Sequence, residues 1–326
     1  MDRKYKHLTP EQVESFMKHG FLRIEKCFTP EQAEEWTGTV WTRLGMSPTD
    51  KSTWNRERIN MPSHREKPVQ EFAPKAWEAM CEILGGEDRI AKESAVWNDG
   101  LIVNLGSPEF EGKFPHPKEL PGWHVDGDFF VHYLDSREQA LLVIPLFTDI
   151  KPHAGGTVIC SDAVPLIAKH LYDHPEGVSP RMVPRGEEPK HEGLGFYTEL
   201  IQQCSEFHEM TGNLGDVILM HPLMAHSASR NSLRLLRIIT NPPVSLVEPF
   251  NFDRENPDDY SLVELKTLQV LGKDRLKGWK VTGPREMVVP ERLKEQNKMK
   301  VLELERLEKL QAANPPVANN TPAVAV

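Results

Sequence analysis

The sequence predicts a mainly β domain, a sandwich or barrel, with helices on its flanks. Short apolar runs rich in β-branched residues recur over about residues 97–245. Turn signals bound these runs, as in Ala154-Gly155-Gly156, and strands of this length and spacing are typical of sandwiches and barrels. Helical patterns occupy residues 9–45 and 290–311, on either side of the apolar runs.

The N-terminal segment predicts two capped helices with a short strand between them. Thr9-Pro10-Glu11-Gln12 supplies a capping residue, a proline at the first helical position and a glutamine at the third. The same four residue types recur at 29–32, and Gly20 ends the first helix. Residues 21–24 alternate as a strand does. We interpret the repeated string as shared capping chemistry rather than an internal repeat.

The middle of the chain predicts most of the β core. We expect strands over residues 101–105, 140–147, 157–159, 216–220 and 235–240, and helices near 74–85 and 164–172. Residues 48–75 are polar and show no period, which predicts a mobile surface loop.

No boundary inside residues 1–311 is sharp, so we expect a single domain over that range. It comprises N-terminal helices at 9–45, a core at about 97–245 and a C-terminal helical extension at 255–311. Residues 312–326 are uncharged and rich in Ala, Pro, Asn and Val, which predicts a disordered tail.

Composition excludes several classes of function. The formal net charge is −9, which argues against nucleic acid or an anionic membrane as partner. No apolar run reaches the roughly 18 residues of a membrane span, and the N-terminus lacks a signal-peptide core. The 4 cysteines are dispersed without a CxxC pair, which favours reduced thiols in a cytoplasmic protein. The sequence leaves the oligomeric state open.

The string Trp123-His124-Val125-Asp126-Gly127 carries the clearest chemistry. In a strand, residues two apart point to the same side, so His124 and Asp126 can present an imidazole and a carboxylate to one point. Two further histidines, His221 and His226, follow a Gly-Asp turn and a buried strand. Either of them could complete a set of two histidines and one carboxylate, which suits non-haem Fe(II) oxygenases.

Arg237 lies inside an apolar strand and shares a face with Leu235 and Ile239. A guanidinium on an inward face needs an anion. That anion is either a ligand or a buried Asp or Glu in a structural ion pair, and the sequence alone leaves both open.

Taken together, these motifs resemble the phytanoyl-CoA dioxygenase family of Fe(II)/2-oxoglutarate oxygenases. The opening LTPEQVESFMKHGFLRIEKCFTPEQ, the turn and strand in HAGGTVICSDAV, and GDVILMHPLMAHSASRNS are each similar to segments of that family. The resemblance covers about residues 7–245 and implies a double-stranded β-helix, the cupin-like jelly roll.

The resemblance implies that His124, Asp126 and His226 bind Fe(II), and that Arg237 holds the distal carboxylate of 2-oxoglutarate. His226 is preferred because the family's ligand is the later histidine of an HPLxxH string, and Arg237 then sits at the family's spacing. His221 would instead be a core residue or a support for the ligands.

Three further residues are candidate 2-oxoglutarate contacts: Asn104, Ser227 and Ser229. For Asn104 the alternative is a hydrogen bond to a neighbouring loop. The family often places a serine two residues after the second histidine, where this chain has Ala228.

The activity implied is that of a dioxygenase that uses Fe(II), 2-oxoglutarate and O2 and releases succinate and CO2. The presence of Asp126 favours hydroxylation or another oxidation over halogenation, because related halogenases replace this carboxylate. We expect a small apolar or amphipathic substrate, such as a natural product. The alternatives are an acyl-CoA hydroxylase and a non-catalytic jelly-roll protein that binds a metal or ligand.

Four aromatic residues are candidate substrate contacts: Trp54, Phe129, Phe130 and Tyr133. The alternative for them is ordinary core packing. Four more histidines lie within residues 161–210, at spacings that match no compact metal site: His170, His174, His191 and His208. We expect those histidines to have surface or hydrogen-bonding roles.

Overall fold

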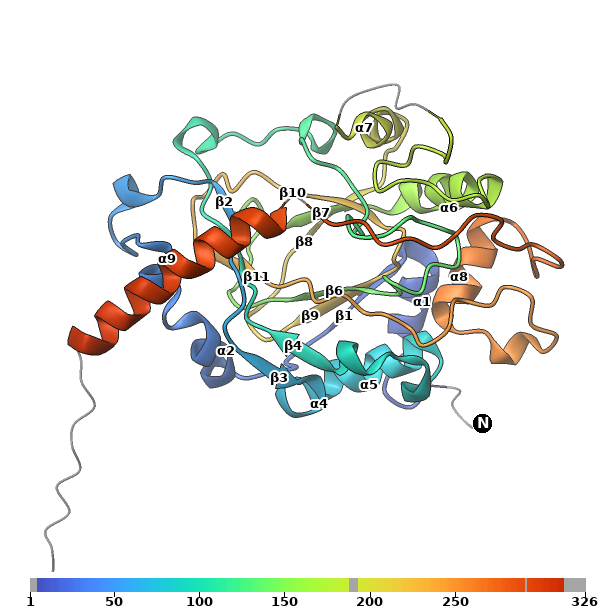
Figure 1. Cartoon of the computed structure of the whole chain (residues 1–326), viewed down its shortest axis with the longest axis horizontal. Helices are drawn as coiled ribbons and strands as arrows, with labels where there is room; N and C mark the ends of the chain where they lie inside the picture. Colours follow the sequence, from blue (N-terminus) through green and yellow to red (C-terminus); the bar gives the residue numbers. More distant parts are fainter. Residues whose placement is uncertain (1–4, 188–192, 291, 314–326) are drawn as a thin grey trace, which may run out of the picture.

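The computed structural model describes residues 5–187, 193–290 and 292–313, and it consists of β sheets with flanking helices (Figure 1). The first sheet has the order β1 (Phe21–Ile24), β9 (Val217–Met220), β6 (Leu142–Pro145). The second has the order β10 (Ala225–Ala228), β7 (Thr157–Cys160), β8 (Phe207–Met210). The third has the order β11 (Arg237–Ile239), β5 (Ile102–Asn104), β2 (Arg58–Asn60).

All strand pairs within these sheets are antiparallel. Single bridges between Leu146 and Ile239 and between Leu141 and Val244 connect the first sheet to the third. A smaller sheet pairs β3 (Glu66–Pro68) with β4 (Val96–Asn98). In Figure 1 the first and second sheets lie one below the other, with the third sheet to one side.

Strands β6, β7 and β9 are buried at every position rather than alternately. Such continuous apolar runs are expected where both faces of a strand are covered. The helices that pack together beside the sheets are α1 (Pro10–His19), α5 (Pro74–Leu84), α6 (Val164–Asp173) and α8 (Leu262–Val270). The predicted strands of the core are thus confirmed in place: four are slightly shorter than their apolar runs, and β7 extends one residue further, to Cys160.

The N-terminal caps form as predicted. Thr9 and Gln12 make a complete capping box at the start of α1, and Thr29 and Gln32 make another at the start of α2 (Pro30–Thr37). Gly20 ends α1 with a φ of 77°, a left-handed conformation that glycine adopts readily. The remaining helices are α3 (Val40–Leu44), α4 (Val69–Phe72), α7 (Gly195–Gln202) and α9 (Arg292–Ala313).

The prediction of a mobile loop over residues 48–75 is wrong. This segment forms β2, β3 and α4, because a few apolar residues among its charges anchor it to the core. Ile59, Val69 and Phe72 are buried, and the ring of Phe72 stacks on Trp36 at 4.4 Å. Polar residues outnumber these anchors, so the segment shows no hydrophobic period.

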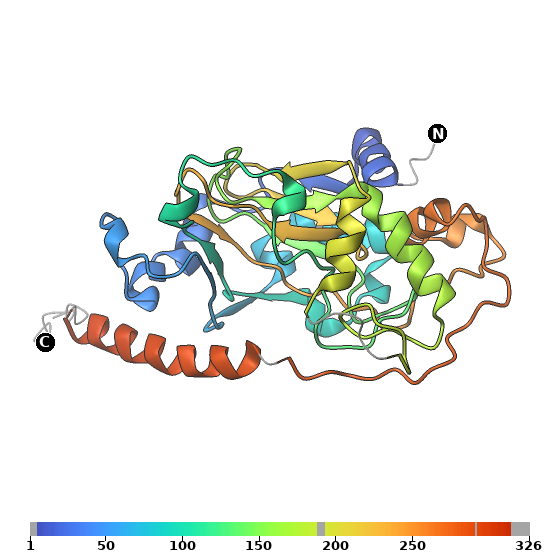
Figure 2. The same ribbon diagram turned by 90° about the horizontal axis from the view of Figure 1, so that it is seen from above.

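Helix α9 runs along the outside of the sheets (Figure 2) and buries a single one of its described side chains, Glu303. The Glu303 carboxylate lies 2.9 Å from Arg43 Nε and 2.8 Å from His64 Nε2, and Arg43 also pairs with Asp99 at 3.0 Å. Residues 312 and 313 belong to this helix, contrary to the predicted tail, and the rest of that predicted tail lies outside the described residues.

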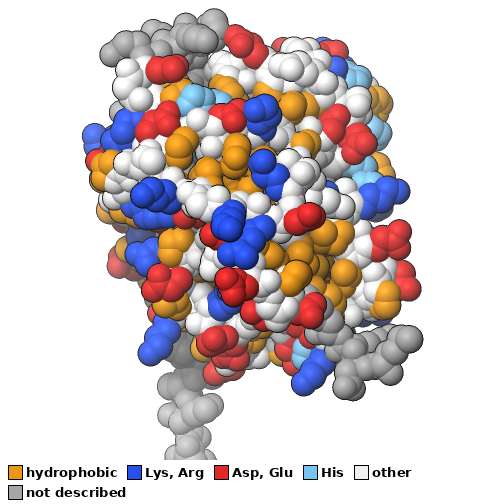
Figure 3. Space-filling model, turned by 90° about the vertical axis from the view of Figure 1, so that its right-hand side faces the viewer, with side chains coloured by type: hydrophobic (Ala, Val, Ile, Leu, Met, Phe, Trp, Pro, Cys, Tyr) orange, Lys and Arg blue, Asp and Glu red, His pale blue; other side chains and the backbone are white. Residues whose placement is uncertain are grey.

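On the face shown in Figure 3, acidic and basic side chains are interspersed with apolar ones. The net charge of −9 therefore does not gather on this face into a patch of one sign. Within the described ranges, no helix combines the length and apolar character that a bilayer span requires.

Candidate metal centre

His124, Asp126 and His226 come together at one point, with one ligand atom from each within 4.8 Å of the others. Nε2 of His124 and Nε2 of His226 each lie 3.5 Å from the same oxygen, Oδ1 of Asp126. Metal–nitrogen bonds of about 2.1 Å at right angles place neighbouring ligand atoms roughly 3 Å apart. Only a small contraction would therefore bring these three atoms around one ion.

Two backbone hydrogen bonds hold His124 and His226 opposite each other. His124 N–H donates to the carbonyl of His226 at 3.1 Å, and His226 N–H donates back to His124 at 2.9 Å. Residues that face each other in an antiparallel bridge project their side chains to the same side. This one bridge therefore joins the two motifs that lie far apart in the sequence.

The predicted regular strand through His124 and Asp126 is wrong, because only His124 makes a bridge. The chain turns directly after Asp126 at Gly127, where φ is 119°. A side-chain carbon at Gly127 would lie 2.5 Å from the ring of Phe130, so only glycine fits this turn. The turn, rather than strand alternation, directs the carboxylate toward the imidazoles.

Backbone carbonyls select the tautomer of both histidines. Nδ1 of His124 lies 2.7 Å from the carbonyl oxygen of Gly122, and Nδ1 of His226 lies 3.0 Å from that of Met224. A carbonyl only accepts, so Nδ1 carries the proton in each ring and the lone pair remains on Nε2. Ligand histidines in proteins are commonly held in this way, so the three residues fit a metal ion.

The carboxylate is held in its ionised form. Burial alone would raise the pKa of Asp126, but when the imidazoles are protonated the charge of His226 and hydrogen bonds from both rings outweigh burial, and this pKa lies well below its usual range. Burial alone would lower the pKa of His124, but the Asp126 carboxylate and the Gly122 carbonyl outweigh it, so this pKa is raised.

We expect metal affinity to fall as the solution becomes acidic. A metal ion needs the neutral imidazole. Because the pKa of His124 is raised above its ordinary value of 6.5, protons compete with the metal ion at a higher pH than they would for an ordinary histidine. Affinity is therefore present above that pKa and lost as pH falls through it. Titration of Ni(II) against the protein between about pH 8 and pH 6 checks this, and an affinity that stays constant over that range would contradict it.

Asn241 is a neighbour of the centre that the sequence did not reveal. Its side-chain amide donates to Oδ2 of Asp126 at 3.4 Å, from just beyond β11. Alternation along the strand puts Asn241 on the same face as Arg237 and Ile239, which is the signal that could have identified it. Through this contact, the strand that carries Arg237 reaches the carboxylate of the metal centre.

Arg237 is 1% exposed, and its guanidinium contacts carbonyl oxygens: Nε donates to Gly155 at 2.6 Å and Nη1 to Ile102 at 3.2 Å. Among the described residues, the structure records no carboxylate paired with it, so the alternative of a structural ion pair is not supported. Burial and the nearby Arg58 lower the pKa of Arg237 to about 9. An anion beside this group would relieve that cost.

Arg58, Asn104 and Arg237 form a row across the third sheet, because Asn104 on β5 is in register with Arg58 on one side and Arg237 on the other. Cross-strand neighbours project to the same face. Arg58 belongs to the segment predicted to be a mobile loop, yet the strand pairing fixes it as a second guanidinium beside Arg237.

The other predicted 2-oxoglutarate contacts have partners within the protein. Asn104 donates to the carbonyls of Ser229 at 3.1 Å and Gly155 at 3.4 Å, which is the loop-bonding alternative. Ser227 Oγ donates to Pro121 at 2.7 Å, and Ser229 Oγ donates to Glu209 at 3.1 Å. Strand alternation also places both serines on the opposite face of β10 from His226.

Of the predicted substrate contacts, the structure leaves Phe129 half-buried. Phe130 and Tyr133 are each 1% exposed, and the Tyr133 hydroxyl donates to Pro284 at 2.6 Å. Trp54 stacks on Trp41, with ring centroids 5.5 Å apart, and its indole donates to Ser47. Phe130, Tyr133 and Trp54 thus pack as core aromatics, the alternative that the sequence left open.

His221 is fully buried and lies outside the cluster of three. Nε2 is 2.9 Å from Oγ1 of Thr267, while Nδ1 accepts from Leu223 N–H at 3.2 Å. Burial and the charge of Lys266 lower its pKa to about 3, so the ring is neutral.

We expect His221→Ala to lower the free energy of unfolding by about 2–4 kcal/mol through the cavity and the two lost hydrogen bonds, while the protein still binds metal. Chemical denaturation and metal analysis of the folded variant check this. Loss of metal from a variant that remains folded would contradict it.

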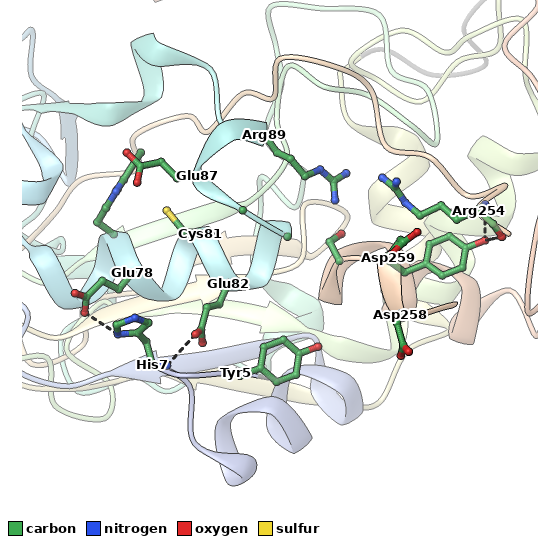
Figure 4. A pocket seen from close by; sticks show the side chains of 15 residues that line it. Tyr5, His7, Glu78, Cys81, Glu82, Glu87, Arg89, Arg254, Asp258 and Asp259 are labelled. Atoms are coloured by element: carbon green, nitrogen blue, oxygen red, sulfur yellow. Dashed lines mark hydrogen bonds and ion pairs between the residues drawn. The ribbon is translucent and has the colours of Figure 1, made fainter. Parts of the chain in front are cut away.

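A pocket of about 810 Å³, shown in Figure 4, has none of His124, Asp126 and His226 in its wall. Its wall includes Glu78, Glu82, Arg89 and Arg254, and His7 bonds across it to Glu78 at 3.0 Å. Arg89 and Arg254 both pair with the buried Glu264, at 2.8 Å and 3.0 Å. These guanidinium groups therefore serve an internal ion-pair network.

Neither models of known protein families nor the curated proteins give a match to this chain. Among solved structures, SnoK, a non-heme alpha ketoglutarate dependent carbocyclase from nogalamycin biosynthesis, is similar at 14% identity and a TM-score of 0.40, covering 73% of this chain and 84% of that one. HygX from Streptomyces hygroscopicus, with nickel, 2-oxoglutarate and hygromycin B bound, has 12% identity and a TM-score of 0.41, covering 76% and 90%. ThoJ, a non-heme monooxygenase in complex with nickel, has 14% identity and a TM-score of 0.39, covering 93% and 99%. Likeness this distant carries no weight for function, which rests on the side chains themselves.

Proposed function

We propose that this protein is an Fe(II)- and 2-oxoglutarate-dependent dioxygenase that hydroxylates or otherwise oxidises a small organic molecule. The observation that carries the proposal is the convergence of His124 Nε2 and His226 Nε2 on one oxygen of Asp126, with both Nδ1 atoms tied to carbonyls. Two imidazoles and one carboxylate on one side of a metal leave the remaining positions open, as non-haem Fe(II) oxygenases require.

Arg237 supports 2-oxoglutarate as the co-substrate. The guanidinium of Arg237 is buried, and its recorded partners among the described residues are carbonyl oxygens. Such a group suits a carboxylate, to which it can donate two parallel hydrogen bonds. We propose that Arg237 holds the distal carboxylate, and that Arg58, on the same face, adds positive charge for this dianion. Bound iron with 2-oxoglutarate and O2 supplies the oxidising chemistry, while the protein fixes geometry and excludes water.

The strand arrangement is consistent with a double-stranded β-helix in a single domain over residues 1–311. Its two layers would be the first and third sheets, connected by their bridges, and the second sheet extended by His124. The opening motifs resemble the phytanoyl-CoA dioxygenase family within the 2-oxoglutarate oxygenases, and we propose that membership. Residues 255–311 would then close the open side, since Arg292 at the start of α9 pairs with Asp128 at 2.6 Å.

The substrate we propose is a small, partly apolar metabolite. Phe129, which is half-buried and three residues from Asp126, offers an aromatic surface for the hydrophobic body of such a substrate.

Turnover tests the proposal. Purified protein with Fe(II), 2-oxoglutarate, ascorbate and a library of metabolites should release succinate, faster with the true substrate than without one. Omitting iron should abolish release. Absence of iron-dependent succinate across the library, from protein that binds iron, would overturn the proposed activity.

A further inference from the structure

We propose that His19, Glu206 and His208 form a second metal site, for Zn(II) or a similar divalent transition ion, separate from the proposed iron centre. One ligand atom from each of the three side chains lies within 4.8 Å of the others. His19 ends α1, His208 lies on β8, and Glu206 directly precedes that strand. Two imidazoles and a carboxylate are a donor set that suits Zn(II) in a four-coordinate site, with water as the fourth ligand.

The site lies at a seam between two sheets. β1 is the edge of the first sheet and β8 is the edge of the second, and the two strands are not paired with each other in the described structure. A pocket of about 340 Å³ lies along this seam, lined by residues of β1 and β8 that include Phe21, Arg23, His208 and Met210. A metal ion held by His19 and His208 would connect the two sides.

The imidazoles of His19 and His208 are already in edge-to-face contact. Their ring centroids are 5.5 Å apart, and the ring of Phe21 lies 5.5 Å from that of His208. These rings partly shield the cluster from water, and Nδ1 of His19 is buried without a hydrogen-bond partner in the described structure. A buried ring nitrogen without a partner is costly, and a metal ion bound to Nδ1 would remove that cost.

A hydroxyl holds the other two donors in place. Ser161 Oγ donates to Oε2 of Glu206 at 2.8 Å and lies 3.4 Å from Nε2 of His208. Such a group, which orients the ligands without binding the metal, is a regular feature of protein metal sites. The nearby Lys266 is committed elsewhere, since its ammonium donates to the carbonyls of Met17 and Lys18 at 2.7 Å and 3.1 Å.

The test removes the proposed iron ligands first, so that the iron centre no longer contributes to the bound metal. In the full-length double variant Asp126→Ala/His226→Ala, equilibrium dialysis should find about one equivalent of Zn(II). Saturating Zn(II) should raise the Tm by about 5 °C. Co(II) in its place should give the intense visible bands of a four-coordinate ion.

Adding His208→Ala or His19→Ala to this background should abolish all three signals. His174→Ala is the matched control, because His174 also pairs with a glutamate, Glu176 at 2.8 Å, but belongs to no cluster of three ligands. Absence of Zn(II) binding in the folded background variant would overturn the proposal, as would binding that survives both histidine changes. If the background variant does not fold, His208→Ala in the otherwise unchanged chain should remove one of about two equivalents, and unchanged stoichiometry would overturn it equally.

Discussion

Replacement of Asp126 by Asn is expected to remove iron from the protein while leaving it folded. The change keeps the size of the side chain but removes the charge on which both Nε2 atoms converge at 3.5 Å. Changes to groups that only orient a ligand already cost about 10–100-fold in metal affinity, so loss of a ligand should cost at least ~100-fold. Iron titration followed by metal analysis measures this, and succinate release should fall with it.

Asp128→Asn is the matched control for iron binding, because Asp128 lies two residues after Asp126 and its carboxylate pairs with Arg292 at 2.6 Å. It should retain iron. Equal iron affinity in the Asp126→Asn and Asp128→Asn variants would exclude Asp126 as an iron ligand.

Replacement of Arg237 by Ala is expected to weaken 2-oxoglutarate binding without affecting iron. Hydrogen bonds to a charged group are worth about 1.5–3 kcal/mol, which corresponds to roughly 10–150-fold in the dissociation constant. Arg237→Lys should recover part of the loss, since a lysine restores the charge but not the bidentate geometry. Isothermal titration calorimetry with 2-oxoglutarate under anaerobic conditions measures the dissociation constant of the wild-type protein and of both Arg237 variants.

The control for this prediction is Arg230→Ala, since Arg230 lies in the connection between β10 and β11 and is already paired with Glu57 at 2.9 Å. If Arg237 were purely structural, its loss would lower the free energy of unfolding and leave 2-oxoglutarate affinity at the level of the Arg230 variant. That outcome would contradict the role proposed for it.

Local chemistry explains the parts of the fold that the sequence predicted well. The capping boxes at Thr9 and Thr29 use residues three apart, and the buried strands β6 and β9 are unbroken apolar runs. The segment at 48–75 was mispredicted because its anchors are few and pack against distant residues, as Phe72 does on Trp36. Contacts of this kind leave no periodic signal in the segment itself.

The candidate site, like the fold, could be predicted from the sequence only in part. The motifs indicated His124, Asp126 and Arg237, but strand alternation was the wrong reason for the position of Asp126, which depends on the turn at Gly127. Alternation places Asn241 on the strand face of Arg237, but its contact with Asp126 depends on where β11 ends in the fold.

The second cluster was missed for a related reason. The histidines of 161–210 were compared only with one another, and His191 lies outside the described residues. The partner of His208 is His19, which lies near the N-terminus and is brought beside His208 by the fold.

The most direct test of the central claim is an anaerobic titration of the Fe(II)-loaded protein with 2-oxoglutarate, followed by visible absorption. Chelation of the iron by the keto acid should produce a weak charge-transfer band that saturates at about one equivalent. The band should be absent in Asp126→Asn and should require more 2-oxoglutarate in Arg237→Ala. An iron-loaded wild-type protein that shows no band at any concentration of 2-oxoglutarate would contradict the account.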